Sequence, residues 1–166
     1  GVVVVNAPGG STTAAAEHTI AMMLALARHI PRADASLRAG KWQRQEFMGT
    51  EVRHKTLGVI GLGKIGTEVA RRAQGLEMRT LAFDPFASEE LARHLGVELA
   101  SLEDLLRRSD FVTVHTPLTD ATKNLVGTRE LAIMKPSAYL INCSRGGIID
   151  EAALLAALDS GRIAGA

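Results

Sequence analysis

Residues 57–66 read Leu-Gly-Val-Ile-Gly-Leu-Gly-Lys-Ile-Gly, a short apolar run followed by three glycines spaced as G-x-G-x-x-G. The apolar run predicts a buried strand over Leu57–Ile60. The residues after it carry apolar side chains at helical spacing: Ile65, Val69, Ala73 and Leu76. Between a strand and a helix, the first glycine permits a tight turn, the second lets a phosphate approach the backbone, and the third lets the helix pack closely. We therefore expect Gly61, Gly63 and Gly66 to form the pyrophosphate-binding turn of a dinucleotide site.

An acidic residue stands where the next strand should end. We expect that strand over Arg79–Asp84, which places Asp84 23 residues after Gly61. A carboxylate there can accept both ribose hydroxyls of NAD, whereas the 2′-phosphate of NADP would meet a like charge. An Asp in this position can also cap the turn that begins at Pro85, and both interpretations stay open. The first interpretation predicts that the site prefers NAD over NADP.

The alternation of apolar runs with helical patterns continues to the end of the chain. We expect helices over residues 88–95, 128–134 and 150–160, and strands over residues 97–99, 111–115 and 138–142. Further signals mark helix ends, with Ser101 and Asp150 as caps and Gly96 and Gly161 as stops. The strands are apolar on both faces, as in parallel sheets that helices cover on both sides. The predicted fold class is therefore α/β, a doubly wound parallel sheet of the Rossmann dinucleotide-binding type.

The beginning of the chain follows a different pattern. Residues 2–5 are four valines and predict a short strand. A helix is expected from a cap within Ser11–Thr13 to Ile30, where Pro31 should stop it. That helix is apolar nearly all round, which predicts burial on several sides.

Residues 32–55 mix charged residues with large apolar ones, namely Trp42, Phe47 and Met48. The pattern indicates no regular element, and it is typical of an arm whose apolar residues pack on a partner. At the other end of the chain, residues 162–166 resemble the approach to another strand. We expect the chain to be a fragment that is truncated at both ends.

Composition is typical of a single globular domain and excludes several classes of function. The 166 residues are 46% apolar and 22% charged, and 19 basic residues nearly balance 18 acidic ones. Neither nucleic acid nor a membrane is an expected partner of such a chain. The single cysteine, Cys143, permits no internal disulfide and suggests a reducing compartment, so the cytoplasm is the expected location. None of the five histidines has a partner at metal-ligand spacing, and no metal is expected.

A second group of chemically capable residues follows the strand expected over residues 138–142. It reads Asn142-Cys-Ser-Arg-Gly-Gly147, and ligands bind at the carboxyl ends of strands in a parallel sheet. The Arg145 guanidinium could hold a carboxylate or a polarised carbonyl, or it could merely bond a loop carbonyl. At the same edge, His115 could be a general base or a histidine packed beside the cofactor. Cys143 is expected to line the cofactor pocket rather than to act as a nucleophile.

Seven motifs in this order resemble the D-isomer-specific 2-hydroxyacid dehydrogenases. They are Asn6-Ala-Pro8, Ala16-Glu-His18, Gly40-Lys-Trp42, Gly61–Gly66, Asp84-Pro85, His115-Thr-Pro-Leu118 and Asn142–Glu151. The resemblance covers essentially the whole chain, and the ordered set is far more specific than any one motif.

The resemblance implies roles for individual residues. Lys64 and Ile65 would bind the pyrophosphate through their backbone, and Asp84 would bind the adenosine ribose. Thr116 and Cys143–Arg145 would lie on the nicotinamide side. The expected cofactor-binding set also contains Pro85, His115 and Pro117, together with Ser144 of the last segment. Arg145 would be the catalytic arginine, which holds the substrate carboxylate and polarises the carbonyl.

The resemblance also implies a reaction and a domain organisation. NAD would accept a hydride from a D-2-hydroxy acid, with conversion of 3-phospho-D-glycerate to 3-phosphohydroxypyruvate as the first candidate. A hydroxypyruvate or glyoxylate reductase and a non-enzymatic, NAD-sensing corepressor-like module are the alternatives. In this family a glutamate and a histidine relay the proton, and both are expected beyond Ala166.

The same resemblance divides the chain into three parts. Residues 1–10 would be an end strand and hinge from the substrate domain, residues 11–55 a linking helix and dimerisation arm, and residues 56–166 the dinucleotide-binding core. The rest of the substrate domain and the C-terminal catalytic segment would be absent. A homodimer or a higher homo-oligomer is therefore expected.

Overall fold

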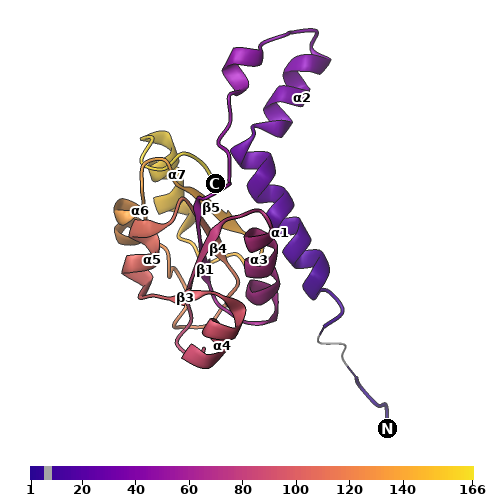
Figure 1. Cartoon of the computed structure of the whole chain (residues 1–166), viewed down its shortest axis with the longest axis vertical. Coiled ribbons are helices and arrows are strands. Elements are labelled where there is room, and N and C mark those ends of the chain that lie inside the picture. Colours follow the sequence, from indigo (N-terminus) through magenta and orange to yellow (C-terminus); the bar gives the residue numbers. More distant parts are fainter. Residues whose placement is uncertain (6–8) are drawn as a thin grey trace.

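A parallel sheet of five strands runs through the described residues, which are 1–5 and 9–166 of this computed structural model (Figure 1). The strands are β1 (Thr56–Ile60), β2 (Arg79–Phe83), β3 (Glu98–Leu99), β4 (Phe111–Val114) and β5 (Tyr139–Asn142). Their order is β3-β2-β1-β4-β5, and every neighbouring pair is parallel. The chain therefore builds outward from β1 in one direction and then from β4 in the other, which puts the topological switch point between β1 and β4.

Helices cover both faces of this sheet (Figure 1). One side carries α1 (Thr12–Ala27), α3 (Lys64–Gly75) and α4 (Glu89–Leu95), and the other carries α5 (Leu102–Arg108), α6 (Thr128–Ile133) and α7 (Glu151–Asp159). Each face has its own apolar core: Val69 of α3 packs in one, and Leu105 of α5 packs in the other. The predicted doubly wound α/β fold is confirmed.

The expected helix ends form as local chemistry dictates. Three caps accept a hydrogen bond from the third residue of their own helix: Ser88 Oγ from Leu91 N at 3.1 Å, Ser101 Oγ from Asp104 N at 3.1 Å and Asp150 Oδ1 from Ala153 N at 3.0 Å. Gly96 and Gly161 take left-handed φ values of 65° and 67° just after α4 and α7. These signals were predictable because each involves only neighbours in sequence.

The strand expected over residues 2–5 is wrong. The structure gives these residues no regular element, and the four valine side chains are 84–92% exposed. Valine favours strands because it packs on a pleated, half-buried surface. Without a paired neighbour or a covered face, that preference has nothing to act on.

The single helix expected up to Ile30 is also wrong. Helix α1 ends at Ala27, His29 takes a left-handed φ of 53°, and a second helix, α2 (Ile30–Arg38), begins with Pro31 in its first turn. Proline stops a helix that arrives from upstream, but its fixed φ also suits the first turn of a new one. The burial expected on several sides of this helix is wrong too. The buried residues of α1 share one face, namely Ala16, Thr19, Met23 and Ala27, whereas Met22 is 49% exposed.

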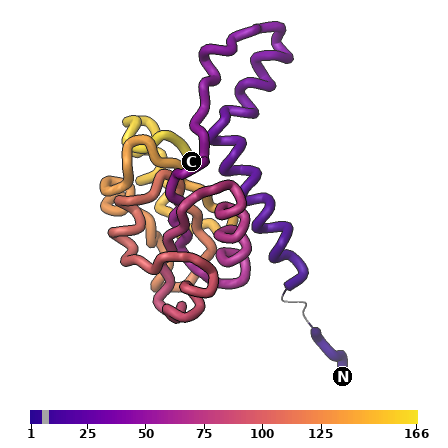
Figure 2. The backbone as a smooth tube through the Cα atoms, viewed as in Figure 1, coloured from indigo at the N-terminus to yellow at the C-terminus, as the bar shows by residue number. Residues whose placement is uncertain are grey.

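Residues 28–50 form an arm that stands off the sheet (Figure 2). The sequence indicated no regular element beyond residue 31, yet the arm contains the whole of α2 and a short 3₁₀ helix, η1 (Arg44–Phe47). The arm closes at its base, where Thr50 N donates to Ala27 O at 2.8 Å. A Cβ on Gly49 would lie 2.5 Å from the same carbonyl oxygen, so only glycine lets the returning chain pass the end of α1 this closely.

Candidate functional site

Four loops that carry expected site residues meet at one edge of the sheet. Ile60 at the end of β1 pairs in register with Phe83 of β2 and with Val114 of β4, and Val114 pairs with Asn142 of β5. The residues that follow these strands therefore lie side by side, and they include the glycine turn, Asp84, His115 and Cys143. This is the edge at which an open parallel sheet binds ligands.

The three glycines of the turn meet three different surroundings. Gly61 has a left-handed φ of 94°, and a Cβ there would lie 3.0 Å from the carbonyl carbon and oxygen of His115. A Cβ on Gly66 would lie 2.0 Å from Gly61 O, which no side chain could tolerate. A Cβ on Gly63 would have no heavy atom within 4 Å. Gly61 and Gly66 thus serve the turn and the packing, whereas Gly63 leaves open space at the start of α3.

That open space belongs to a groove of about 690 Å³ between the beginnings of α1 and α3. Its lining includes Thr12, Thr13, Gly63, Lys64 and Thr67. Helix α3 is 12 residues long, and its N-cap, Gly63, supplies no side chain to bond the free amides of the first turn. Such amides attract an anionic group, so the groove suits a pyrophosphate. The two threonines of α1 were not among the expected site residues, because they lie far from the turn in sequence.

Asp84 fastens the glycine turn to the loop after β2. Its Oδ2 accepts from Leu62 N at 2.8 Å and its Oδ1 accepts from Phe86 N at 2.8 Å. The second bond is the turn cap that the sequence left open as an alternative. It does not exclude the ribose interpretation, because each carboxylate oxygen can accept a further hydrogen bond. Pro85 and Phe86 are exposed beside it, and Phe86 is 96% exposed.

The surroundings of His115 suit a packed neutral histidine. Burial lowers the pKa of His115 to about 4, and its Nε2 lies 2.9 Å from the hydroxyl of Thr113. Thr113 is fully buried on β4. A base with so low a pKa, with one ring nitrogen already engaged, accepts a proton poorly at neutral pH. The sequence analysis missed Thr113, although residues two apart in a strand share a face and the pair could have been found in that way.

Thr116 supplies a polar atom that needs a partner. Its Oγ1 is buried and makes no hydrogen bond within the described part of the chain, and its γ-methyl would lie 3.0 Å from a Cβ on Gly61. A buried hydroxyl without a partner costs about 1–3 kcal/mol. A polar group of a bound molecule, placed between the β1 and β4 loops, would satisfy it. Pro117 follows as an exposed residue.

Arg145 lies exposed in the loop after β5. One of its terminal nitrogens donates to Ser144 O at 2.9 Å, which is the loop-carbonyl bond that the sequence left open as an alternative. The remaining guanidinium donors have no partner among the described residues, and they can still hold a carboxylate. The structure therefore places Arg145 at the same edge as the glycine turn with most of its donors free.

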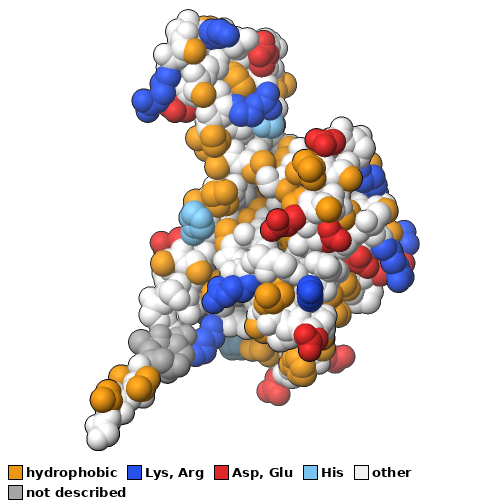
Figure 3. Space-filling model, turned by 180° about the vertical axis from the view of Figure 1, so that it is seen from behind, with side chains coloured by type: hydrophobic (Ala, Val, Ile, Leu, Met, Phe, Trp, Pro, Cys, Tyr) orange, Lys and Arg blue, Asp and Glu red, His pale blue; other side chains and the backbone are white. Residues whose placement is uncertain are grey.

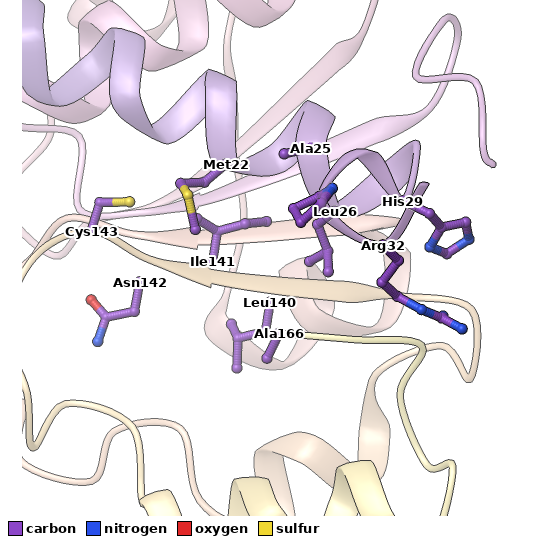
Figure 4. Close-up of a pocket in the computed structure, with 11 residues that line it drawn as sticks. Met22, Ala25, Leu26, His29, Arg32, Leu140, Ile141, Asn142, Cys143 and Ala166 are labelled. Carbon is purple, nitrogen blue, oxygen red and sulfur yellow. The ribbon is translucent and has the colours of Figure 1, made fainter. Parts of the chain in front are cut away.

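Cys143 lines a space that the sequence did not indicate, and its place in the cofactor pocket stays a prediction. It faces an apolar cavity of about 320 Å³ between α1 and β5, together with Met22, Leu26 and Ile141 (Figure 4). Arg32 lies toward the other end of this cavity. The cavity shares no lining residue with the groove beside the glycine turn.

Residues 1–5 and 9–166 contain neither a candidate metal site nor a helix that could span a membrane. No group of three or more histidine, cysteine or acidic side chains could hold a metal ion. No helix in these ranges is long and apolar enough to cross a membrane.

Residues 20–166 match the family described as D-isomer specific 2-hydroxyacid dehydrogenase, NAD binding domain. The chain belongs to this family and is an NAD-binding domain of it, which confirms the resemblance seen in the motifs. The Asn6-Ala-Pro8 motif lies outside the described residues.

Two curated relatives are similar to this chain over its whole length. It is 55% identical over its full length to D-3-phosphoglycerate dehydrogenase of Synechocystis sp. and 54% identical to that of Archaeoglobus fulgidus. It covers 30% and 32% of those two proteins, so it spans about a third of the length of these curated relatives.

Solved structures agree with the fold. D-lactate dehydrogenase of Salmonella superposes with a TM-score of 0.90 at 41% identity, over 96% of this chain and 48% of the other. D-lactate dehydrogenase of Aquifex aeolicus, complexed with NAD and lactic acid, gives a TM-score of 0.90 at 34% identity, over 99% and 50%.

The glycine turn yields a prediction with a matched pair of variants. Gly66→Ala should destabilise the fold by about 1–3 kcal/mol, because its Cβ meets Gly61 O. Gly63→Ala should leave the unfolding midpoint within about 0.5 kcal/mol of wild type, because its Cβ meets open space. Gly63→Ala should instead weaken NADH binding. Thermal unfolding measures the stability of the two variants, and calorimetric titration measures their NADH binding. Equal unfolding midpoints of Gly66→Ala and Gly63→Ala would contradict the packing role of Gly66.

His115 yields a prediction about pH. Its folded-state pKa of about 4 lies below the ordinary value near 6.5, so the unfolded chain takes up the proton first as the pH falls. Stability should therefore be lost between about pH 6.5 and 4, by at most about 1.4 kcal/mol per pH unit. His115→Gln should remove this share of the acid sensitivity, while the exposed control His94→Gln should keep it. Unfolding midpoints across that pH range measure the loss of stability. Identical pH profiles of wild type and His115→Gln would refute the burial of a neutral ring.

Proposed function

We propose that this chain supplies the NAD-binding domain of an enzyme that oxidises a D-2-hydroxy acid to a 2-oxo acid, with 3-phospho-D-glycerate as substrate. The observation that carries the proposal is the exposed Arg145 at the same sheet edge as the glycine turn. An arginine fork beside a nucleotide groove suits an acid that reacts on bound cofactor. The choice of substrate is supported by the curated relatives, whose printed name is D-3-phosphoglycerate dehydrogenase.

The residues present fit NAD in three places. The amides at the start of α3 would hold the pyrophosphate. They include those of Lys64 and Ile65, which follow Gly63, where a Cβ would meet open space. Asp84 would bind the adenosine ribose, and the unpartnered hydroxyl of Thr116 would bond the nicotinamide side. The chemistry that NAD supplies when bound is acceptance of a hydride. Arg145 would hold the substrate carboxylate and polarise the bond at the reacting carbon.

The proton acceptor would come from another part of the longer enzyme. His115 is the only histidine among them that follows a strand at this edge, and its low pKa and its Thr113 bond make it a poor base. The longer relatives possess further chain that could supply a base. The chain by itself should therefore bind NADH and turn over no hydroxy acid.

We also propose the domain organisation of the family for this chain. Residues 1–10 would be a hinge region, residues 11–55 a linking helix and dimerisation arm, and residues 56–166 the cofactor core. Trp42 and Met48 of the arm are 80% and 77% exposed. Figure 3 shows hydrophobic, basic and acidic side chains together on the surface of the arm. Exposed apolar residues of this kind are suited to pack on a second copy of the chain. The cytoplasm, a reducing compartment, is the proposed location.

A chimeric enzyme tests the function. Residues 1–166 would replace the matching segment of the Synechocystis relative, and NADH absorbance would be followed with 3-phospho-D-glycerate, D-glycerate and D-lactate in turn. Turnover of phosphoglycerate that falls sharply, to a small residual rate, in Arg145→Ala supports the proposal. A folded chimera that binds NADH but oxidises none of the three acids contradicts it, and a preference for D-lactate or D-glycerate overturns the choice of substrate.

The cofactor preference can be measured on the chain itself. A like charge at 4 Å costs about 4 kcal/mol at an effective dielectric of 20 before screening, so NADH should bind at least about tenfold more tightly than NADPH. Asp84→Ala should narrow that gap and also lower the unfolding midpoint, because it frees the amides of Leu62 and Phe86. The exposed control Asp120→Ala should do neither. Equal affinities in wild type would refute the ribose role of Asp84.

The arm gives a prediction about assembly. Light scattering should report a dimer, and Trp42→Asp should shift the population to monomer, because a charge would replace a large apolar contact. The unfolding midpoint should hardly change, since Trp42 is exposed in the single chain. A wild-type chain that stays monomeric at high concentration would refute the arm as a dimer contact.

A further inference from the structure

The loop that carries Arg145 is fastened by one amide side chain. Asn142 Oδ1 accepts from Ser144 N at 3.0 Å and from Ser144 Oγ at 2.7 Å. Its Nδ2 donates to Arg145 O at 2.9 Å. The Asn142 side chain thus makes three hydrogen bonds within its own loop, and one of them reaches the backbone of the arginine itself.

The chemistry of the partners fixes the orientation of this amide. A backbone N–H can only donate and a backbone carbonyl can only accept. The oxygen of Asn142 must therefore face Ser144 N, and its nitrogen must face Arg145 O. No other side chain can make both bonds in this space with the same shape, since aspartate lacks the donor and leucine lacks both groups.

Asn142 is itself held by the sheet, whereas the residues after it are not. Asn142 is the last residue of β5 and pairs with Val114 of β4. Arg145 and Gly146 are exposed, and a Cβ on Gly146 would meet nothing within 4 Å. Burial therefore does little to hold this part of the loop. The hydrogen bonds of the Asn142 amide therefore link the fixed end of β5 to the backbone of Ser144 and Arg145.

The side chain of Arg145 depends on the same group. One of its terminal nitrogens donates to Ser144 O at 2.9 Å, and Ser144 is held by Asn142 through both its amide and its hydroxyl. The direction of the guanidinium thus follows from the placement of Ser144. A misplacement of about 1 Å at such a group can lower the rate about 100-fold.

We propose that Asn142 is the positioning residue for Arg145: it sets the place and direction of the guanidinium without touching the substrate. The proposal rests on the function proposed above for Arg145. It assigns a separate role to a residue of the loop that the expected cofactor-binding set did not include.

The first experiment needs no activity. Amide hydrogen exchange and the Nε–H resonance of Arg145 would be followed by NMR in the chain and in its variants. Asn142→Ala should expose the Ser144 amide to exchange and mobilise the Arg145 side chain. Asn142→Asp should keep the Ser144 amide protected but mobilise Arg145, because an oxygen then faces Arg145 O. The exposed control Asn124→Asp should change neither signal. An Arg145 side chain that is equally ordered in all variants overturns the proposal.

The second experiment uses the chimeric enzyme. Asn142→Asp should lower kcat about 100-fold, with the Kd for NADH close to wild type, because the groove at α3 is untouched. In an Arg145→Ala background the same change should lower kcat about twofold or less, since the two residues act as one unit. An equal loss in both backgrounds overturns the proposal. If the unmutated chimera oxidises no hydroxy acid, the proposed function fails, and the NMR comparison alone decides the role of Asn142.

Discussion

The contact between the first and third glycines of the turn is the constraint on which the site depends. Helix α3 can begin beside β1 only because Gly66 has no Cβ to meet the carbonyl oxygen of Gly61, 2.0 Å from where that atom would be. Gly61 in turn lies against the backbone of His115, which joins the end of β1 to the end of β4. The switch point of the sheet is thus held by backbone against backbone, and a helix start is left facing an open groove.

Around this fixed centre, two polar side chains order loops that burial cannot order. Asp84 bonds the amides of Leu62 and Phe86, and Asn142 bonds the backbone of Ser144 and Arg145. Both residues lie at or just after strand ends, so each transmits the rigidity of the sheet to an exposed segment. Side-chain hydrogen bonds to nearby backbone are well suited to this task, because they need no apolar cover.

Local signals made most of the core predictable, and signals that depend on distant partners did not. The capped helices at Ser88, Ser101 and Asp150 follow from contacts three residues apart. Pro31 was misread because the same ring geometry ends one helix and begins another, and only the left-handed His29 separates the two.

Residues 2–5 misled for a related reason, since strand propensity without a paired strand or a covered face is not realised. In the site, the motifs predicted which loops gather at the edge. The pairing of Thr113 with His115 and the groove lining by Thr12 and Thr13 depend on side chains that no motif marked.

The position of Trp42 has a practical consequence. It is the single tryptophan of the chain, it lies on the arm, and 80% of its surface is exposed. None of the loops that gather at the nucleotide edge contains another indole. The intrinsic fluorescence of this protein therefore reports on the polarity around the arm. Emission that shifts to shorter wavelength on concentration, without added nucleotide, would mark the moment at which that ring leaves water.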